Sequence, residues 1–386
     1  MSEALHWHRR RFLQSAAALP WLGSLALAQD QGGEGGPARI VREYQPRNLE
    51  YPFASLDQPI TPTRLFYVRN HFPEPALDAS TWRLKVEGAV EKPLELDLAS
   101  LKQLPRVERV VTLECAGNGR LFLTPTERGV QWDTGAIGTA QWSGVSLGSV
   151  LDLAKVKPPA VEVVLEGADA GEVRSDPRSP GKIAFARSLP LGKARAPEVL
   201  LAYGMNGEPL PAAHGFPLRA VVGGWYGMAS IKWLTRILVV EQPFQGFYQS
   251  LDYTYWERQN GLPTLKPITA MQVKSAIARP ARGEVVAAGS KYVVRGAAWA
   301  GESAVARVEL STDGGKSWQP VKLSSKPEPF VWTLWTHEWL VPRVPGTASL
   351  MVRATDAQGR TQPMQRDPDR RNYVITHVVP TEVQIR

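Results

Sequence analysis

The sequence predicts a mixed α+β domain followed by a smaller all-β sandwich of the immunoglobulin type. The first observation is length, because 386 residues exceed one ordinary hydrophobic core and favour two or three domains. The second is that few segments before residue 265 are long enough for helices. The third is a change in the sequence pattern near residues 263–267. After it, short runs of alternating apolar and polar residues recur about every ten residues without a helical period.

The elements of the first domain follow from local patterns. Alternating or β-branched runs predict strands at 64–68, 82–90, 107–113, 161–165, 199–203, 220–222 and 237–240. Helices are expected at 98–104, where Asp97 provides an N-cap, and at 147–154. Asn206-Gly207 predicts a hairpin turn. The polar stretch 169–181, rich in Gly, Pro and Ser, predicts a loop.

The second domain is expected to contain only strands. Runs at 291–295, 305–311, 331–335 and 349–354 alternate between apolar and polar residues, and turn signals such as Asp313-Gly314-Gly315 separate them. The expected boundaries are therefore 48–265 for the α+β domain and 266–386 for the sandwich.

The N-terminus has the features of an export signal. Arg9, Arg10 and Arg11 precede Phe-Leu and a short apolar run, which ends in the small-x-small sequence Ala26-Leu-Ala28. We interpret residues 1–28 as a twin-arginine signal peptide and 29–47 as a flexible mature N-terminus. An uncleaved anchor is disfavoured because the run is shorter than a membrane span and contains Pro20. The expected location is the periplasm or another exported compartment, with no membrane span after signal removal.

The composition limits the classes of ligand and fold. Hydrophobic residues make up 43% and charged residues 21% of the chain, as in soluble globular proteins. The formal net charge of +8 favours anionic ligands. Because the charges are scattered and do not interleave with aromatics, nucleic-acid binding is not expected. A single cysteine excludes an internal disulfide framework.

That cysteine lies in the most unusual stretch of the chain. The apolar run 107–113 breaks at Glu114-Cys115 into the glycine-rich loop Ala-Gly117-Asn-Gly119-Arg120. A thiolate is a soft ligand for transition metals, and a nearby guanidinium favours the thiolate form. Free cysteines are also commonly buried as small apolar residues. The local residues alone leave both interpretations open.

Cationic residues recur beside glycines at several strand ends. They occur in Arg69-Asn70-His71, in Cys115–Arg120, in His214-Gly-Phe-Pro-Leu-Arg219 and in the segment from Gly223 to Lys232. Backbone amides of glycine loops and Arg or Lys side chains are suited to phosphate. No Gly-x-Ser-x-Gly elbow, Cys-x-x-Cys, His-Glu-x-x-His or Gly-x-Gly-x-x-Gly motif supports a serine hydrolase, a zinc site or a dinucleotide site.

Taken together, these motifs resemble the sulfite oxidase family of molybdenum enzymes across residues 44–386. The motifs that carry the resemblance are Tyr67-Val-Arg-Asn-His71, Glu114-Cys-Ala-Gly-Asn-Gly-Arg120, Trp132-Asp-Thr-Gly-Ala-Ile-Gly138, Trp142-Ser-Gly-Val, His214-Gly-Phe-Pro-Leu-Arg219, Ile231-Lys-Trp-Leu and Asp252-Tyr253.

The resemblance implies roles for individual residues. Cys115 would ligate molybdenum beside the dithiolene of one molybdopterin. Arg69 and Arg120 would form an oxyanion pocket, with Trp132 as a wall and Tyr253 as a hydrogen-bond donor near the reacting oxygen. The residues expected to hold the pterin and its phosphate are Tyr67, Asn70, His71, Asp169, His214, Arg219, Ser230, Ile231 and Lys232.

Two positions depart from the family pattern. The family loop often has arginine where this chain has Gly119. A third arginine of the substrate pocket aligns loosely with Arg371, and Arg366 or Arg370 are alternatives. We expect the choice of substrate to depend on these positions.

The function implied is molybdenum-dependent oxidation of sulfite to sulfate. No haem-binding domain is expected in the chain, so electrons would pass to an external acceptor such as a c-type cytochrome. The chain would form a homodimer through its sandwich, or a heteromer with a cytochrome subunit.

Three alternatives remain at this point. Within the family, a sulfane dehydrogenase would oxidise sulfur bound to a carrier protein. Methionine sulfoxide reductase relatives resemble the first domain but lack the sandwich. From a different class, the chain could be a secreted binding or adhesion protein in which Cys115 is inert.

Overall fold

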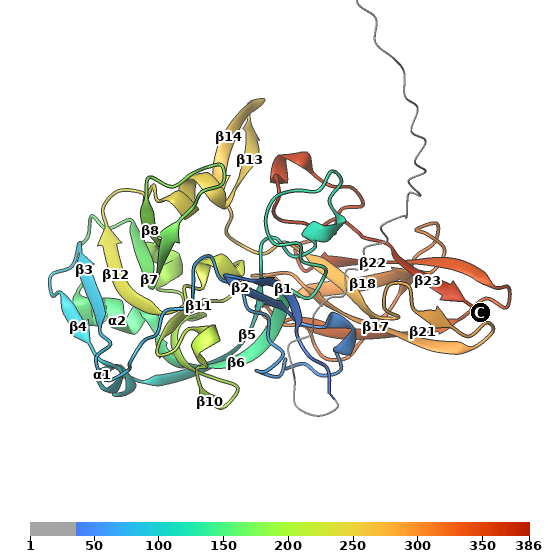
Figure 1. Ribbon diagram of the computed structural model, residues 1–386, viewed down its shortest axis with the longest axis horizontal. Helices are drawn as coiled ribbons and strands as arrows, with labels where there is room; N and C mark the ends of the chain where they lie inside the picture. The colour runs from blue at the N-terminus through green and yellow to red at the C-terminus, as the bar shows by residue number, and fades with distance from the viewer. Residues whose placement is uncertain (1–35) are drawn as a thin grey trace, which may run out of the picture.

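The structure is a computed structural model that describes residues 36–386, so the predicted signal peptide lies outside the described residues. A sheet-rich unit formed by the first two thirds of the chain lies beside an elongated β-sandwich formed by the last third (Figure 1). The predicted α+β class with a C-terminal sandwich is therefore confirmed. None of the helices between residues 36 and 386 has the length and apolar composition that crossing a membrane requires.

Two five-stranded sheets organise the first unit. One has the order β10-β9-β6-β5, with β11 also paired to β9. Its strands are β5 (Arg106–Glu114), β6 (Ile137–Ser146), β9 (Val199–Met205), β10 (Glu208–Pro209) and β11 (Arg219–Val222). The other has the order β4-β3-β12-β7-β8, in which only the β12–β3 pair is parallel. Its strands are β3 (Leu84–Gly88), β4 (Leu94–Leu96), β7 (Glu162–Glu172), β8 (Lys182–Pro190) and β12 (Leu234–Val240).

Short helices and two hairpins complete this unit. The α-helices are α1 (Leu98–Lys102), α2 (Leu147–Ala154) and α3 (Leu191–Ala194). The hairpins pair β1 (Ile40–Tyr44) with β2 (Arg47–Glu50) and β13 (Thr254–Gln259) with β14 (Leu262–Pro267). The single-turn helices are η1 (Phe53–Ser55), η2 (Arg120–Phe122), η3 (Ala212–His214), η4 (Gly227–Ala229), η5 (Tyr248–Asp252) and, in the second unit, η6 (Pro368–Arg370). The β13–β14 hairpin projects from the body of the molecule (Figure 1).

The sandwich packs a four-stranded sheet against a five-stranded sheet. The first sheet, of order β15-β17-β21-β20, contains β15 (Lys274–Arg279), β17 (Lys291–Trp299), β20 (Lys322–Leu323) and β21 (Thr333–Leu340). The second, of order β16-β23-β22-β18-β19, contains β16 (Val285–Val286), β18 (Val305–Ser311), β19 (Gln319–Pro320), β22 (Gly346–Asp356) and β23 (Thr381–Ile385).

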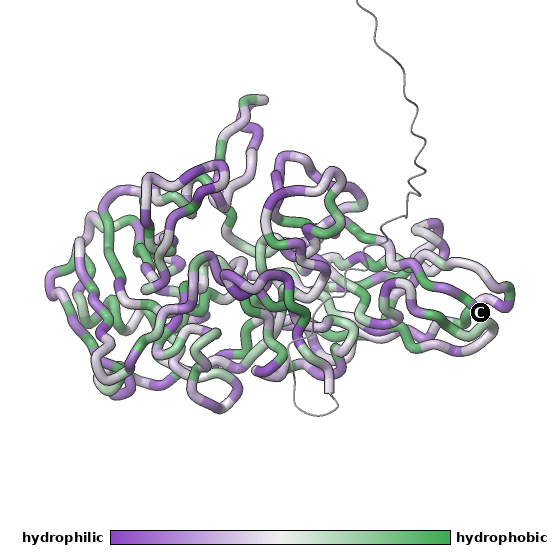
Figure 2. The backbone as a smooth tube through the Cα atoms, in the orientation of Figure 1, coloured by the Kyte–Doolittle hydropathy of each residue, from purple (hydrophilic) through white to green (hydrophobic). Residues whose placement is uncertain are grey.

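The alternating pattern of β22 explains how the sandwich forms. Ala348, Leu350, Val352 and Ala354 point into one core cluster, which also contains Trp335 of the opposite sheet. Side chains two residues apart share a face of a strand, so this alternation buries one side of β22. Hydrophobic stretches follow the strands of both units, and the surface loops are mainly hydrophilic (Figure 2).

Several local predictions are confirmed. Asp97 caps α1, because its Oδ1 accepts a hydrogen bond from the Ser100 amide at 2.7 Å. Asn206 and Gly207 form the turn between β9 and β10, both with positive φ (53° and 85°). The strands expected within 107–113, 199–203 and 305–311 also form.

Two local predictions were wrong. The segment 64–68 is a turn rather than a strand, since the Phe66 amide donates to the Pro62 carbonyl at 3.0 Å, and only Val68 bridges to Leu49. The loop expected at 169–181 begins later, because Ala170 to Glu172 continue β7 and pair with β8. Cross-strand pairing with β8, which the sequence analysis did not identify, supplies the hydrogen bonds that make this polar stretch a strand.

Candidate active site

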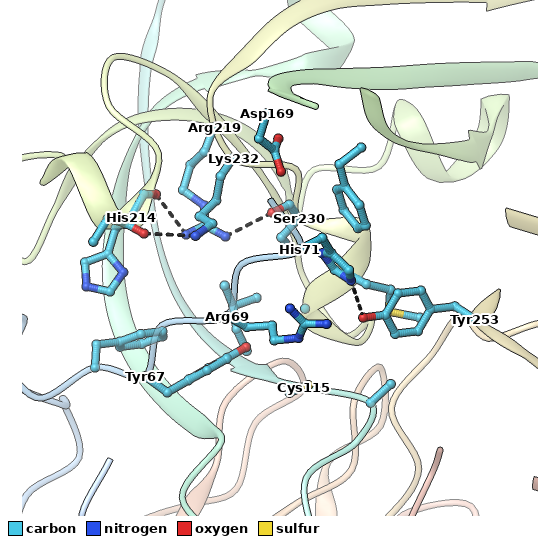
Figure 3. Close-up of a pocket in the computed structure, with 17 residues that line it drawn as sticks. Tyr67, Arg69, His71, Cys115, Asp169, His214, Arg219, Ser230, Lys232 and Tyr253 are labelled. Carbon is cyan, nitrogen blue, oxygen red and sulfur yellow. Dashed lines mark hydrogen bonds between the residues drawn. The ribbon is translucent and has the colours of Figure 1, made fainter. Parts of the chain in front are cut away.

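A cavity with about 640 Å³ of empty space lies between the two sheets of the first unit and the loop that follows β5. Most of the residues predicted to bind a cofactor line it, although they come from widely separated segments (Figure 3). The predicted residues in the lining are Tyr67, Arg69, His71, Cys115, Asp169, His214, Arg219, Ser230, Lys232 and Tyr253.

Cys115 lies where β5 ends and its loop begins. The Cys115 amide donates to the Ala136 carbonyl of the segment before β6 at 2.8 Å, and the Cys115 carbonyl accepts from the Asn118 amide at 2.9 Å. The positive φ of Gly119, 96°, lets the chain turn sharply into η2. The thiol is 6% exposed and forms no disulfide. The backbone bonds on both sides of Cys115 therefore hold its side chain at the cavity wall.

Two cations form one wall of the cavity. Arg219 donates to the backbone carbonyls of His214 and Ser230, each at 3.0 Å, and its guanidinium lies 4.8 Å from the Trp142 ring centroid. Lys232 donates to the Asn70 side chain and to the Ala213 carbonyl. These bonds to neutral groups fix both side chains. Among the described residues neither cation donates a hydrogen bond to a carboxylate, although the charge of Asp169 acts on Lys232 from nearby.

Burial shifts the protonation of this wall. Burial and the nearby Arg219 charge lower the pKa of Lys232 from its ordinary 10.5 to about 7. Burial also raises the pKa of Asp169 to about 6, and the Lys232 charge opposes that shift. An anion in the cavity would favour the charged form of Lys232. The wall therefore suits a ligand that carries phosphate.

The two histidines of the cavity are neutral. Burial is the main cause that lowers the pKa of both His71 and His214 well below 6.5. The charge of Arg69 adds to this shift for His71, and the charge of Lys232 adds to it for His214. His71 Nε2 lies 2.7 Å from the Tyr253 hydroxyl, and Phe185 stacks on the His71 ring at 4.1 Å between centroids. Neutral imidazoles can both donate and accept hydrogen bonds, which fits the mixed donor and acceptor edges of a pterin.

Arg69 lies where the cavity opens to a second, outer cavity of about 980 Å³. Arg69 and His71 line both cavities, and the outer wall also includes Arg128, Arg174 and Tyr373. Figure 3 shows the Arg69 guanidinium between the side chains of Tyr67 and Tyr253. Within residues 36–386 it donates a hydrogen bond to the Asn70 carbonyl and to no other protein group. Its remaining N–H groups can therefore bind an anion that enters from outside.

Five predicted residues do not line the inner cavity. Asn70 lies behind the wall and accepts from Lys232, which makes it a support for that cation. Ile231 is fully buried in the core. Trp132 is also fully buried, and its Nε1 has no hydrogen-bond partner among the described residues. The other two are Arg120 and Arg371.

Arg120 is held by carbonyl groups rather than directed into the cavity. Its Nε donates to the Asn372 carbonyl at 3.1 Å and its Nη1 to the Val130 carbonyl at 2.7 Å. Its guanidinium lies 5.2 Å from the centroid of Tyr373. Because Val130, Asn372 and Tyr373 line the outer cavity, Arg120 supports that wall from behind.

The C-terminal arginines also face protein groups. Arg371 donates to the Thr254 hydroxyl and the Leu251 carbonyl, on either side of Tyr253. Arg366 donates to the carbonyls of Tyr373 and Val374, at 2.7 and 2.8 Å. Arg370 stacks on Tyr255 at 4.4 Å. None of the three lines either cavity of the described structure.

Gly119 faces away from the site. A Cβ there would meet Ile375 Cγ2 at 3.1 Å and Lys274 Nζ at 3.7 Å. Gly119 instead lines a separate cavity of about 430 Å³ at the junction of the two units. The difference from the family loop at this position therefore alters the junction and not the cofactor cavity.

The apolar part of the lining was not predicted from the sequence. The residues that complete the cavity are Phe66, Leu113, Ala116, Phe185, Ala213, Gly227 and Met228. A Cβ on Gly227 would lie 2.6 Å from the Tyr67 hydroxyl, so the wall passes close to the ring. The adjacency of Gly227-Met-Ala to Ser230 was a signal for that segment, whereas nothing local marked Phe185.

The donor set fits one kind of metal cofactor. Residues 36–386 contain no group of three or more His, Cys, Asp and Glu side chains that could hold a metal ion. A metal at Cys115 would therefore need most of its ligands from a cofactor. The cations of the wall and the neutral histidines fit a phosphate-bearing pterin that carries the metal.

Comparisons with known proteins agree with this geometry. Residues 71–248 match the family model "Oxidoreductase molybdopterin binding domain", and residues 265–371 match "Mo-co oxidoreductase dimerisation domain". The chain is 39% identical to human mitochondrial sulfite oxidase over 346 residues, which cover 85% of this chain and 62% of that protein. It is 37% identical to chicken sulfite oxidase, of which it covers 73%, and 33% identical to that of Arabidopsis thaliana, of which it covers 88%.

A solved structure is similar over nearly the full length. The sulfane dehydrogenase SoxCD from Paracoccus pantotrophus superimposes with a TM-score of 0.77 and 27% identity, and the match covers 94% of both chains. The chain spans about 62% of the length of the human relative.

Proposed function

The chain belongs to the sulfite oxidase family of molybdenum enzymes, and on this premise we propose that it oxidises sulfite to sulfate with a molybdenum–molybdopterin cofactor bound at Cys115. The observation that carries the proposal is the cavity itself. It joins the only cysteine of the chain to Arg69, Arg219 and Lys232, in surroundings that keep both histidines neutral. Family membership also argues against an adhesion protein with an inert Cys115.

The residues divide into two groups by task. Lys232 and Arg219 would hold the cofactor phosphate, and His214, His71, Ser230 and Tyr67 would contact the pterin. When bound, the cofactor supplies the two-electron redox chemistry and the transfer of oxygen. Sulfite and water become sulfate, two protons and two electrons, and an external acceptor takes the electrons.

Arg69 and Tyr253 would act on the substrate. Arg69, which is half-buried, can bind a dianion arriving from the outer cavity. The Tyr253 hydroxyl, which the His71 ring holds at 2.7 Å, can donate a hydrogen bond to a substrate oxygen. Burial raises the pKa of Tyr253, which keeps the proton on that hydroxyl.

Location and partners belong to the same proposal. The twin-arginine sequence in residues 1–28 supports export of the folded, cofactor-loaded protein to the periplasm. There, a c-type cytochrome would accept the electrons. The dimerisation module at 265–371 supports a homodimer or a heteromer with a cytochrome subunit.

The second candidate is a sulfane dehydrogenase that acts on sulfur bound to a carrier protein. One observation that favours it is the similarity to SoxCD over 94% of both chains. The absence of Arg366, Arg370 and Arg371 from both described cavities points the same way.

Two measurements on each purified protein test the proposal. Molybdenum content and sulfite-dependent reduction of cytochrome c are measured on the same sample, for the wild type and for Cys115→Ser. We expect about one molybdenum per wild-type chain, and loss of turnover in the folded variant. Full activity in Cys115→Ser would contradict the role of this thiol. A wild type that contains molybdenum and does not oxidise free sulfite, but oxidises carrier-bound sulfane sulfur, would favour the second candidate.

A further inference from the structure

The segment that carries Cys115 has two functionally different sides. Leu113 and Cys115 line the cofactor cavity. Neighbouring residues bind the C-terminal third of the chain instead. The Thr112 amide donates to the Phe330 carbonyl at 2.8 Å, and the Ala116 carbonyl accepts from the Val374 amide at 2.7 Å. Two connections of the β-sandwich, between β20 and β21 and between β22 and β23, therefore bind the Cys115 segment before and after the thiol.

The centre of these contacts is the carboxylate of Glu114, the residue before Cys115. It is 1% exposed. It accepts hydrogen bonds from Asn118 Nδ2 at 3.0 Å, Lys274 Nζ at 3.0 Å and Trp299 Nε1 at 2.8 Å. Lys274 Nζ also donates to the Asn118 carbonyl at 3.0 Å. The same cation thus binds the residue before Cys115 and a residue of the loop after it.

The sandwich presents both of its donors from one point. Lys274 begins β15, Trp299 ends β17, and the two residues are direct partners in the β15–β17 register. Side chains of directly opposite residues lie on the same face of a sheet, so both reach the same carboxylate. The rigidity of the sheet is therefore transmitted to the backbone of Glu114.

Burial distinguishes this pair from a second ion pair between the two units, Lys193–Glu302. Lys274 and Glu114 expose only 7% and 1% of their side chains, whereas Glu302, which binds Lys193 at 2.6 Å, exposes 45%. A desolvated pair with all its hydrogen bonds made has one favourable geometry, and losing one partner leaves a buried charge unpaired. The Glu302 carboxylate is solvated, and Lys193 has a second carboxylate partner in Glu198 at 2.6 Å, so loss of the Lys193–Glu302 contact leaves no buried charge unpaired.

We propose that Glu114, Lys274 and Trp299 form a positioning clamp, through which the β-sandwich fixes the direction of the Cys115 thiol at the wall of the cofactor cavity. This inference rests on the proposed role of Cys115 as metal ligand. The sandwich thereby helps to position an active-site residue, in addition to any role it has in dimerisation. The three residues are positioning residues, because they act through the backbone of the Cys115 segment.

The first test uses the full-length chain prepared without cofactor. Cys115 is the only cysteine, so the rate of alkylation by iodoacetamide reports this thiol alone. We expect Lys274→Met and Trp299→Phe to raise that rate at least about tenfold, because local opening becomes easier. Lys274→Arg, which keeps the charge, should restore most of the protection. Glu302→Gln removes an ion pair at the same junction and should leave the rate unchanged.

The second test uses the loaded enzyme. We expect Trp299→Phe to lower kcat at least about tenfold with KM for sulfite nearly unchanged, and to shift the thiolate-to-molybdenum absorption band. A merely structural role would lower the melting temperature and leave the alkylation rate and the band as in the wild type, which would overturn the proposal. If Lys274→Met does not fold, Trp299→Phe and the charge-neutral double variant Glu114→Gln/Lys274→Met decide the question.

The outcome is separable from that of the proposed function. If Cys115→Ser still binds molybdenum in the wild-type amount, the role of the thiol as ligand fails, whatever the clamp variants do. If Cys115→Ser loses the metal but the clamp variants alkylate like the wild type, the ligand assignment holds and the clamp is refuted.

Discussion

Arg69 gives the sharpest quantitative prediction about the substrate. It lies at the junction of the inner and outer cavities and donates to only one protein carbonyl within the described residues. We therefore expect a substrate anion that enters from the outer cavity to meet this guanidinium. Arg69→Met removes the charge and the donors but keeps a side chain of comparable length.

The size of the effect follows from the energy of one desolvated contact. A hydrogen bond to a charged group contributes about 1.5–3 kcal/mol, and about 1.4 kcal/mol corresponds to a factor of ten. Loss of one such contact should raise KM for sulfite by about 10- to 150-fold. Arg69→Lys keeps the charge without the planar fork, so it should recover only part of the loss.

Steady-state reduction of cytochrome c, normalised to the molybdenum content of each sample, measures the change. Arg174→Met provides the matched control, because Arg174 lines the outer cavity but exposes 86% of its side chain. It should change KM by less than about twofold, since exposed charges contribute little. An unchanged KM in Arg69→Met would refute the reasoning, and so would an equal effect in both variants.

Three further predictions concern the cavity wall, the loop and the core. Burial lowers the pKa of Lys232 to about 7, and the charge of sulfate is constant around this pH. Sulfate should therefore bind the cofactor-free protein with full affinity below pH 7, and its affinity should fall about tenfold per pH unit above pH 7. Calorimetric titration checks this, and Lys232→Met should remove the tenfold-per-unit decline above pH 7. Gly117→Ala places a Cβ within 2.5 Å of Arg120 Cζ, so it should cost about 1–3 kcal/mol in thermal unfolding and lower kcat, whereas Gly192→Ala, with open space around it, should do neither. Leu101→Ala in α1 should cost about 2–5 kcal/mol in denaturant unfolding and leave kcat/KM unchanged; a change in kcat/KM would contradict the expectation that Leu101, which does not line the cavity, contributes to stability alone.

Local patterns determined the elements and most of the site. The cap of α1, the Asn206-Gly207 turn and the alternating strands of the sandwich depend on interactions between near neighbours, so the sequence predicted them. The motifs around Cys115, Arg219 and Lys232 likewise predicted a site for an anionic ligand, because glycine amides and a cation at a strand end can bind an anion wherever the strand lies. The family resemblance identified that ligand as a cofactor.

Tertiary contacts decided where the long polar side chains point. Arg120, expected in an oxyanion pocket, instead binds a carbonyl at Asn372, which lies 252 positions away. Arg371 binds Thr254, and Gly119 faces the junction between the two units. A guanidinium has several donors and a flexible stem, so its direction depends on which carbonyls folding brings within reach.

The link between the sandwich and the Cys115 segment belongs to the same class. Glu114 was visible in the sequence only as a charge at the end of an apolar strand. Its partners lie 160 and 185 residues further along the chain, at Lys274 and Trp299. The sequence by itself determined that Cys115 ends a strand beside cations and glycines. Only the tertiary structure decided what holds that strand, because a buried charge must find its partners in three dimensions rather than along the chain.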